Sequence, residues 1–413
     1  MTSNDRIELM APAGSFDAMQ AAIDNGADSV YFGIEQLNMR ARSSINFTLE
    51  DLKEIAERCN KAGVRTYITL NTIIYDHDLS LVKNIINTAV EAGITAIIAS
   101  DQGVIAFARS VGMEVHISTQ LNITNVETLK FYALFADTIV LSRELSLRQV
   151  KDITRSVERE QIKGPSGRLI EVEIFGHGAL CMAVSGKCYL SLHTQNSSAN
   201  RGACVQNCRR KYKVIDIEDG HELEIDNEYI MSPKDLCTLD FLPKVIDAGV
   251  SVIKLEGRGR APEYVATVVK AYRQAIDAVY EGTYTPERVE EWMDLLRTVY
   301  NRGFWGGYYL GQEMGEWTDS SGSKATQKKV YLGKGMHYYA KPKVGHFRME
   351  AHTLKKGDKI LITGPTTGVW EMNVPEMRVD DKVADEAKRG DDVTFMVETV
   401  IRPSDKLYKI VEA

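Results

Sequence analysis

The sequence predicts an α/β protein whose main domain is a (β/α)8 barrel of the TIM type, with a long insert after strand seven and a small C-terminal antiparallel β-barrel. Three observations predict this fold. A helix-ending glycine recurs before short apolar segments, eight such segments alternate with helical stretches, and the pattern changes to short strands and turns near residue 330. The chain has 413 residues, 44% of them hydrophobic, which is enough for a large core.

The repeated unit joins the end of a helix to a strand through glycine. It reads AAIDNGADSVYFG (21–33), NKAGVRTYITLN (60–71), VEAGITAIIAS (90–100) and VIDAGVSVIKLEG (245–257). Glycine accepts the left-handed conformation that ends a helix. The remaining apolar segments are 7–14, 114–119, 138–142 and 171–176. Strands that are apolar on both faces and alternate with helices form parallel sheets, so we expect a closed barrel, with a doubly wound open sheet as the alternative.

Polar side chains follow most of the predicted strands. Barrels of this type place their active sites at the C-terminal ends of the strands, so these residues are candidates for one common rim. For any single residue the alternative is that it simply begins a loop. The candidates are Arg40, Arg42, Asn71, Thr119, Gln120, Asn122, Arg143, His177, Glu256 and Arg258.

The insert after strand seven, residues 177–250, contains five of the six cysteines. Their spacing is C-x6-C-x15-C-x3-C-x28-C, and the sixth, Cys59, falls in a helical stretch and is expected in the core. Zinc sites usually contain two tight C-x2–4-C pairs, whereas iron–sulfur clusters accept irregular spacing. The spacing therefore leaves three interpretations: an iron–sulfur cluster, zinc, or buried or redox-active thiols. The five cysteines are Cys181, Cys188, Cys204, Cys208 and Cys237.

Four segments resemble the signature of a family of collagenase-like peptidases of unknown catalytic type: HGALCMAVSGKCYLS, NRGACVQNCRRKY, SPKDLC and IKLEGRGRAPEYVATVVKAYR. This family also includes proteins of tRNA wobble-uridine 5-hydroxylation, rRNA cytidine hydroxylation and ubiquinone hydroxylation. The resemblance implies oxygen-independent hydroxylation, linked in the tRNA branch to prephenate as co-substrate. It also implies a 4Fe–4S cluster held by Cys181, Cys188, Cys204 and Cys237, with Cys208 as an alternate ligand.

The resemblance and the residues together predict a tRNA-hydroxylating enzyme, and they suggest roles for the polar residues. Arginines suit phosphate and carboxylate groups because they bind them bidentately. Arg201, Arg209 and Arg210 are candidates for contacts with tRNA phosphates, with a solvated charged face as the alternative. The candidate catalytic residues are His177, Glu256, Arg258 and Gln120. The candidate substrate-binding residues are Arg40, Arg42, Asn71, Thr119, Asn122, Arg143, Arg201, Arg209 and Arg210.

Glu256 and His177 each have a structural alternative to a catalytic role. Arg40, Arg42 and Arg258 would hold a small carboxylate co-substrate, unless Glu256 is their structural ion-pair partner. His177 is interpreted as a proton donor, as a hydrogen-bond donor to a cluster sulfur, or as a structural histidine.

The competing function is a collagenase-like peptidase with zinc, or a hydroxylase acting on rRNA or another substrate. Neither an H-E-x-x-H nor a G-x-S-x-G motif occurs in the sequence. The net charge of −7 argues against a protein that coats DNA regardless of sequence. The sequence has neither a secretory signal nor a stretch of about eighteen apolar residues, so we expect a cytoplasmic protein without a membrane span.

The C-terminal quarter reads differently. We expect the barrel domain at 1–312, a polar linker at 313–329 and a β-barrel domain at 330–413. In the last segment, a basic residue followed by Gly-Asp precedes apolar strands in KKGDKILITGP and RGDDVTFMVET. We expect this domain to position the substrate or to dock on the catalytic domain. The sequence does not indicate the oligomeric state.

Overall fold

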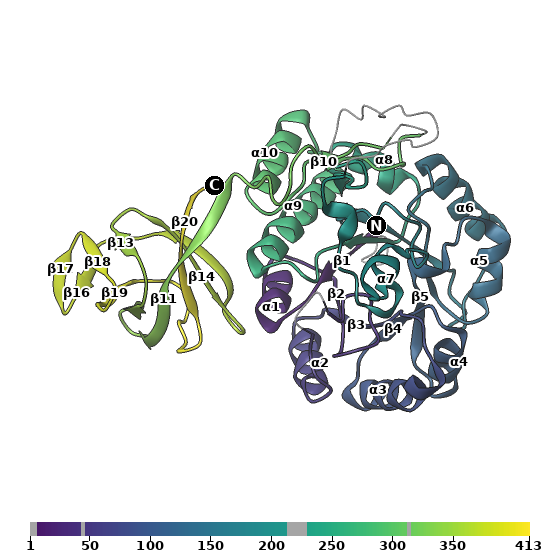
Figure 1. The fold of residues 1–413 in the computed structure, drawn as a ribbon, viewed down its shortest axis with the longest axis horizontal. Helices are drawn as coiled ribbons and strands as arrows, with labels where there is room; N and C mark the ends of the chain where they lie inside the picture. Colours follow the sequence, from purple (N-terminus) through teal and green to yellow (C-terminus); the bar gives the residue numbers. More distant parts are fainter. Residues whose placement is uncertain (1–5, 43–45, 213–228, 312–314) are drawn as a thin grey trace.

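A computed structural model describes residues 6–42, 46–212, 229–311 and 315–413 (Figure 1). Eight parallel strands form its main sheet, and because β9 pairs with both β1 and β7, the sheet closes into a barrel. The predicted (β/α)8 class is therefore confirmed. The strands are β1 (Glu8–Pro12), β2 (Ser29–Phe32), β3 (Arg65–Leu70), β4 (Ala96–Ala99), β5 (Glu114–Ile117), β6 (Thr138–Val140), β7 (Glu171–Gly178) and β9 (Val252–Leu255).

Helices surround the barrel, and several end as the glycine repeats predict. Helix α3 ends at Gly93, which has a φ of 77° in the left-handed region. Side-chain caps start other helices; Ser146, for example, forms a capping box with Gln149. The helices are α1 (Phe16–Asp24), α2 (Asp51–Lys61), α3 (Leu79–Ala92), α4 (Gln102–Ser110), α5 (Val126–Ala133), α6 (Leu147–Arg159), α7 (Leu190–Gln195), α8 (Leu242–Asp247), α9 (Pro262–Glu281) and α10 (Pro286–Arg297).

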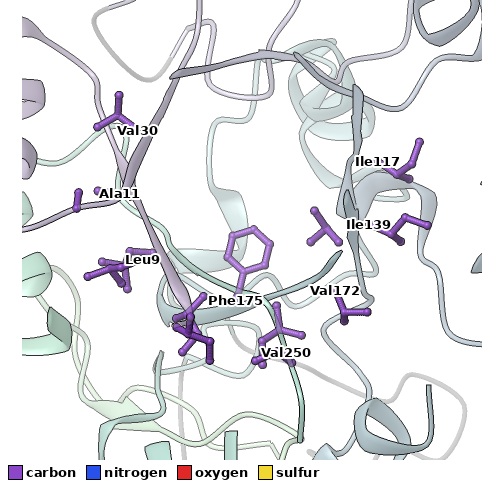
Figure 2. Close-up of a cluster of buried hydrophobic side chains, with 14 of the residues drawn as sticks. Leu9, Ala11, Val30, Ile117, Ile139, Val172, Phe175 and Val250 are labelled. Atoms are coloured by element: carbon purple, nitrogen blue, oxygen red, sulfur yellow. The ribbon is translucent and has the colours of Figure 1, made fainter. Parts of the chain in front are cut away.

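Alternate residues of each barrel strand face opposite sides of the wall. Leu9 and Ala11 of β1 belong to the large apolar core between the wall and the helices, whereas Met10 belongs to a small cluster with Tyr67 and Ile98. Figure 2 shows part of the large core, including Val30, Ile117, Ile139 and Val172. Because the period of a strand is two, the residues between these point into the barrel. That inner set contains several charged side chains, which matter for the site.

Two short strands extend the sheet beyond the barrel. The end of β7 pairs antiparallel with β8 (Asp235–Cys237), and β8 pairs in parallel with β10 (Phe304–Trp305). The insert is also tied to the barrel by hydrogen bonds, from the Ile73 amide to the Asn200 carbonyl (3.0 Å) and from the Arg42 amide to the Gly202 carbonyl (3.2 Å). The hairpin that 211–225 suggests falls mostly outside the described residues. These contacts bring the cysteine-rich segment to the barrel mouth.

The C-terminal domain is antiparallel, as predicted (Figure 1). Its main sheet has the order β15-β14-β20-β11-β12-β19-β16-β17, beside a separate β13–β18 pair. It contacts the barrel domain through α1, which packs on β15, and through an ion pair between Lys329 and Glu263 (2.9 Å). The strands are β11 (Gln327–Tyr339), β12 (Val344–Met349), β13 (Thr353–Lys355), β14 (Lys359–Gly364), β15 (Gly368–Asn373), β16 (Met377–Val379), β17 (Lys382–Ala384), β18 (Glu386–Lys388), β19 (Asp392–Met396) and β20 (Lys406–Glu412).

Among the described helices, none combines the length and the apolar character needed to cross a bilayer.

Candidate functional site

A cavity of about 490 Å³ lies at the C-terminal ends of the barrel strands. Barrel residues such as Tyr31, Phe175 and Lys254 line one side of it, and insert residues within 181–190 and 199–209 line the other. The barrel residues are held in position by strands, and the insert residues are held mostly by loops. The cavity therefore lies where (β/α)8 barrels carry their active sites.

The cavity lining is strongly cationic. Among the described lining residues, eight are basic and one, Glu256, is acidic. This excess contrasts with the net charge of −7 for the whole chain, so positive charge is concentrated here. The arrangement suits an anionic ligand. The basic residues are Arg40, Arg143, Lys187, Arg209, Lys254, Arg258, Arg260 and Arg302.

Glu256, the acid of the cavity, is held as a carboxylate. It accepts hydrogen bonds from Arg40 Nη2 (2.7 Å) and from the Ala179 amide (3.3 Å). Burial acts to raise its pKa, but Arg40, Arg260 and Arg143 outweigh burial and lower the pKa to about 2. A group that stays ionised at neutral pH is a poor general acid or base. The geometry thus supports the structural interpretation, in which Glu256 orients Arg40.

Arg258 and Arg143 are fixed from behind. Arg258 Nη1 donates to Asn38 Oδ1 (3.0 Å) and Thr69 Oγ1 (2.8 Å), and burial lowers its pKa to about 10. Arg143 donates to the Ala179 carbonyl (3.0 Å) and stacks on the ring of Phe175, 3.7 Å from its centroid. Each guanidinium has five N–H donors, and these contacts use only some of them. Both are therefore preorganised to bind an anion.

The neutral polar candidates divide into two groups. Asn71, Thr119 and Gln120 line the cavity, and Asn71 Nδ2 donates to Ser118 Oγ (3.3 Å). Asn122 lies outside the lining, where its side chain donates to the Ser185 carbonyl of the insert (2.9 Å). It therefore anchors the insert instead of contacting a ligand in the cavity.

Three predicted substrate-binding arginines also lie outside the cavity lining. Arg201 pairs with Asp78 (2.5 Å) and stacks on Tyr75, while Arg42 and Arg210 are exposed on the surface. Arg209 does line the cavity, but its guanidinium donates to the Leu180 and Pro233 carbonyls, both at 2.6 Å. It therefore holds two parts of the insert together.

Four of the five insert cysteines line the cavity: Cys181, Cys188, Cys204 and Cys208. Burial raises the pKa of the Cys208 thiol, and Cys181, Cys204 and Cys188 act in the same direction, so each of the three lies within electrostatic range of Cys208. Within the described part of the chain, no three Cys, His, Asp or Glu side chains are close enough to bind one metal ion together. The thiols gather around one space without a formed ligand geometry. Thiolates are soft ligands, so the chemistry of these four side chains suits an iron–sulfur cluster or zinc.

Cys237, the fourth ligand that the resemblance implies, is not among the residues that line the cavity. It lies on β8, 3% exposed, with its Sγ 3.7 Å from Met293 Sδ and 3.8 Å from Tyr272 Oη. Burial raises the pKa of its thiol to about 12. Sequence spacing alone does not show that Cys237 is buried on β8. The ligand set with Cys237 stays a prediction, and Cys208, its alternate, lies in the cavity lining beside the other three.

His177 also lies away from the cavity lining. It is 2% exposed and sits among the rings of Tyr264, Tyr272 and Phe304. Burial lowers its pKa to about 3, so it is neutral at physiological pH. Of the three interpretations of this residue, the structural histidine fits these surroundings.

Sequence reasoning missed several cavity residues, among them Tyr31 and Lys254 of the barrel strands. Both occupy the middle of apolar strands, in SVYF and VIKL. A lysine within an otherwise apolar buried strand was a usable signal, because lysine is rarely buried without a partner. Its position in the alternation predicts that it points into the barrel.

Comparison with known proteins identifies the family of this chain. Residues 14–319, most of the chain, match the family described as Peptidase family U32. The chain belongs to this family. It is 55% identical over 409 residues to a protein named collagenase from Porphyromonas gingivalis, covering 99% of both chains. It is 30% identical to tRNA hydroxylation protein P1 of Bacillus subtilis, covering 97% of this chain and 94% of that one.

A third U32 relative acts on a different RNA. The chain is 35% identical over 280 residues to the 23S rRNA 5-hydroxycytidine C2501 synthase of Escherichia coli, covering 68% of this chain and 40% of that protein. Proteins similar to this U32 chain are thus named either for collagen cleavage or for hydroxylation of RNA.

Proposed function

We propose that this U32 protein is an iron–sulfur-dependent enzyme that hydroxylates a pyrimidine base of RNA, with tRNA wobble uridine as the target and prephenate as co-substrate. The observation that supports this most is that four thiols and eight cationic side chains share one cavity at the barrel mouth. RNA and a dicarboxylate are both anionic, and thiolates are the ligands of iron–sulfur clusters. The relatives named for tRNA and rRNA hydroxylation support the reaction class.

In this proposal the residues of the cavity have distinct tasks. Cys181, Cys188, Cys204 and Cys208 would hold a 4Fe–4S cluster, which supplies electron transfer or Lewis acidity when bound. Arg143 and Arg258, fixed by their hydrogen bonds, bind the carboxylates of the co-substrate. Glu256 keeps Arg40 oriented toward the same space. Burial of these groups excludes water and strengthens each charge interaction.

A collagenase-like peptidase is the second candidate, because a relative with 55% identity is named collagenase. The cavity offers little to such an activity. A cysteine nucleophile needs an adjacent base, and no histidine occurs among the described lining residues. Glu256 is committed to Arg40 as a carboxylate, so it does not serve as the base.

The test has two steps. The protein is purified without oxygen, and iron and sulfide are measured in wild type, Cys181→Ala and Cys59→Ala, the last as a control thiol in the core. Nucleosides of tRNA and rRNA are then measured by mass spectrometry in a deletion strain complemented with wild type or Cys181→Ala. We expect iron and sulfide in wild type and Cys59→Ala only, and a hydroxylated pyrimidine that disappears on deletion.

Two results would refute the proposal. Stoichiometric zinc without iron would remove the redox cofactor. Unchanged nucleosides in both RNA classes, together with cleavage of gelatin that depends on the cavity residues, would favour the peptidase. Prephenate is tested separately, by restoring the modification in a prephenate-deficient strain with added prephenate.

A further inference from the structure

A buried charged cluster extends from the cavity into the barrel. Lys254 of β9 lines the cavity and donates to Glu173 Oε1 of β7 at 2.8 Å. The other oxygen, Glu173 Oε2, lies 4.0 Å from His116 Nδ1 of β5, and His116 Nε2 lies 3.5 Å from Glu114 Oε1. The side chains of Lys254, Glu173 and His116 are at most 5% exposed, whereas Glu114, the first residue of β5, is 29% exposed. The cluster therefore connects the cavity with solvent at the N-terminal end of β5.

Two atoms at the centre of this cluster lack hydrogen-bond partners. Among the described residues, neither Glu173 Oε2 nor His116 Nδ1 makes a hydrogen bond, and both are buried. A buried polar atom without a partner destabilises the folded state, because it has given up its hydrogen bonds to water. The two face each other at 4.0 Å, which is too long for a hydrogen bond. This pair needs a physical explanation.

The tautomer of His116 provides one. A neutral imidazole carries its proton on one nitrogen, and the carboxylate of Glu114 beside Nε2 favours the proton there. Nδ1 then presents a lone pair to a carboxylate oxygen, so two acceptors oppose each other and stay apart. Protonation of Nδ1 would turn it into a donor and join it to Glu173 Oε2. The pair is therefore arranged to close when His116 gains a proton.

Lys254 is the residue that links this pair to the cavity. Burial lowers the pKa of its ammonium group, the nearby Arg258 and Arg143 act in the same direction, and Glu173 opposes them. Its Nζ also lies over the ring of Tyr31, 4.5 Å from the centroid. An anion in the cavity would neutralise the arginines and offer Lys254 a second partner.

We propose that anion binding in the cavity is coupled to the uptake of one proton by His116. Lys254 Nζ turns from Glu173 to the anion, and His116 Nδ1 takes a proton from solvent. The new N–H stays on Nδ1 and donates a hydrogen bond to the Glu173 carboxylate that Lys254 has left, so a positive charge beside Glu173 is restored. Tyr67 and Glu8 also face His116, and their contacts with each other and with Arg65 remain in place.

The inference rests on the anionic ligand site of the proposed function, and on no step of the hydroxylation. Its sign follows from linkage. Because a proton is taken up on binding, affinity rises as pH falls, by up to about tenfold per pH unit. A cluster with only a structural role would give binding without proton uptake.

The experiment is isothermal titration of the protein with malonate, a small dicarboxylate, in two buffers of different ionisation enthalpy. We expect uptake approaching about one proton per malonate in wild type. His116→Gln and Glu173→Gln should each reduce the uptake below about 0.2 while malonate still binds through the arginines. Lys254→Met should lose the uptake and bind malonate at least about tenfold more weakly. His346→Gln, in the C-terminal domain, should behave as wild type.

Binding without proton uptake in wild type, or uptake that persists in both His116→Gln and Glu173→Gln, would overturn the coupling alone. A wild type that does not bind malonate at any pH between about 5.5 and 8 would refute the anion site shared with the proposed function. If His116→Gln does not fold, Glu173→Gln decides the question, because it keeps the shape and a hydrogen-bond acceptor for Lys254.

Discussion

Replacement of Arg40 by methionine tests whether the Arg40–Glu256 ion pair stabilises the folded protein. Arg40 pairs with Glu256 at 2.7 Å, and the Glu256 side chain is only 12% exposed. Burial would raise the pKa of Glu256, yet Arg40 and its neighbours lower it from the ordinary 4.5 to about 2. At about 1.4 kcal/mol per pKa unit, this difference corresponds to about 3 kcal/mol of stability. That agrees with the roughly 3–5 kcal/mol lost when one partner of a buried pair is removed.

The pH dependence fixes the sign of the effect. Because the pKa of Glu256 is lower in the folded state, its stabilisation is present above about 4.5, the unfolded value, and is lost as pH falls through about 2. Arg40→Met should therefore lower the free energy of unfolding by about 3 kcal/mol at pH 7 and by clearly less near pH ~2.5. Glu256→Gln added to Arg40→Met should recover most of the loss.

The assay is urea unfolding followed by the helical circular dichroism signal, which reports on the barrel because the described C-terminal domain is built of strands. Arg42→Met is the matched control, since Arg42 is exposed two residues further along, and it should cost less than about 0.5 kcal/mol. A cost below about 1 kcal/mol for Arg40→Met, with no dependence on pH, would refute the structural role of this pair.

Three further predictions concern residues around the cavity. Cys208→Ala should remove the bound iron of anaerobically purified protein and Cys237→Ala should retain it; the reverse result would restore the ligand set that the resemblance implies. Burial lowers the pKa of His177 from 6.5 to about 3, so its contribution to stability is present above pH 6.5 and lost as pH falls toward 3; His177→Gln should flatten the melting temperature over that range, and an unchanged profile would contradict this. Gly202→Ala places a Cβ 2.3 Å from the Asn38 carbonyl at a φ of 80°, so it should cost more than about 1 kcal/mol and expose the insert to proteolysis, and equal proteolysis rates would argue against it.

The barrel could be predicted from the sequence because its signals are local. Gly93 ends a helix in the left-handed conformation that glycine accepts easily, and the strand after it is short and apolar. Neighbouring strands then pair in order around the ring, with β9 closing it. The extra strands β8 and β10 were not predicted. They are two or three residues long, and they are fixed by pairing of β8 with β7 and of β10 with β8, which no local pattern shows.

The site was less predictable because it depends on contacts between distant segments. The sequence gathers thiols and arginines in one insert, but loop structure decides which of them face the cavity. Cys208 lines it and Cys237 does not, and the 28 residues between them in the sequence give no sign of this difference. Arg201 forms an ion pair with Asp78, which lies more than a hundred positions earlier in the chain. Such pairings follow from the folded insert and leave no mark in local composition.

The charged residues inside the barrel are better explained by a role in function than by a contribution to stability. Barrels of this class usually fill their interior with branched apolar side chains, and replacing a buried ion pair with apolar residues is often neutral or stabilising. Lys254 and Glu173 therefore are not explained by stability, and the unpartnered atoms of Glu173 and His116 add a cost. The lysine end of this cluster opens into the one cavity that also carries the four thiols and the arginines among the described residues. The energetic cost of the unpartnered atoms of Glu173 and His116 is explained if this cluster responds to an anion that binds in the cavity.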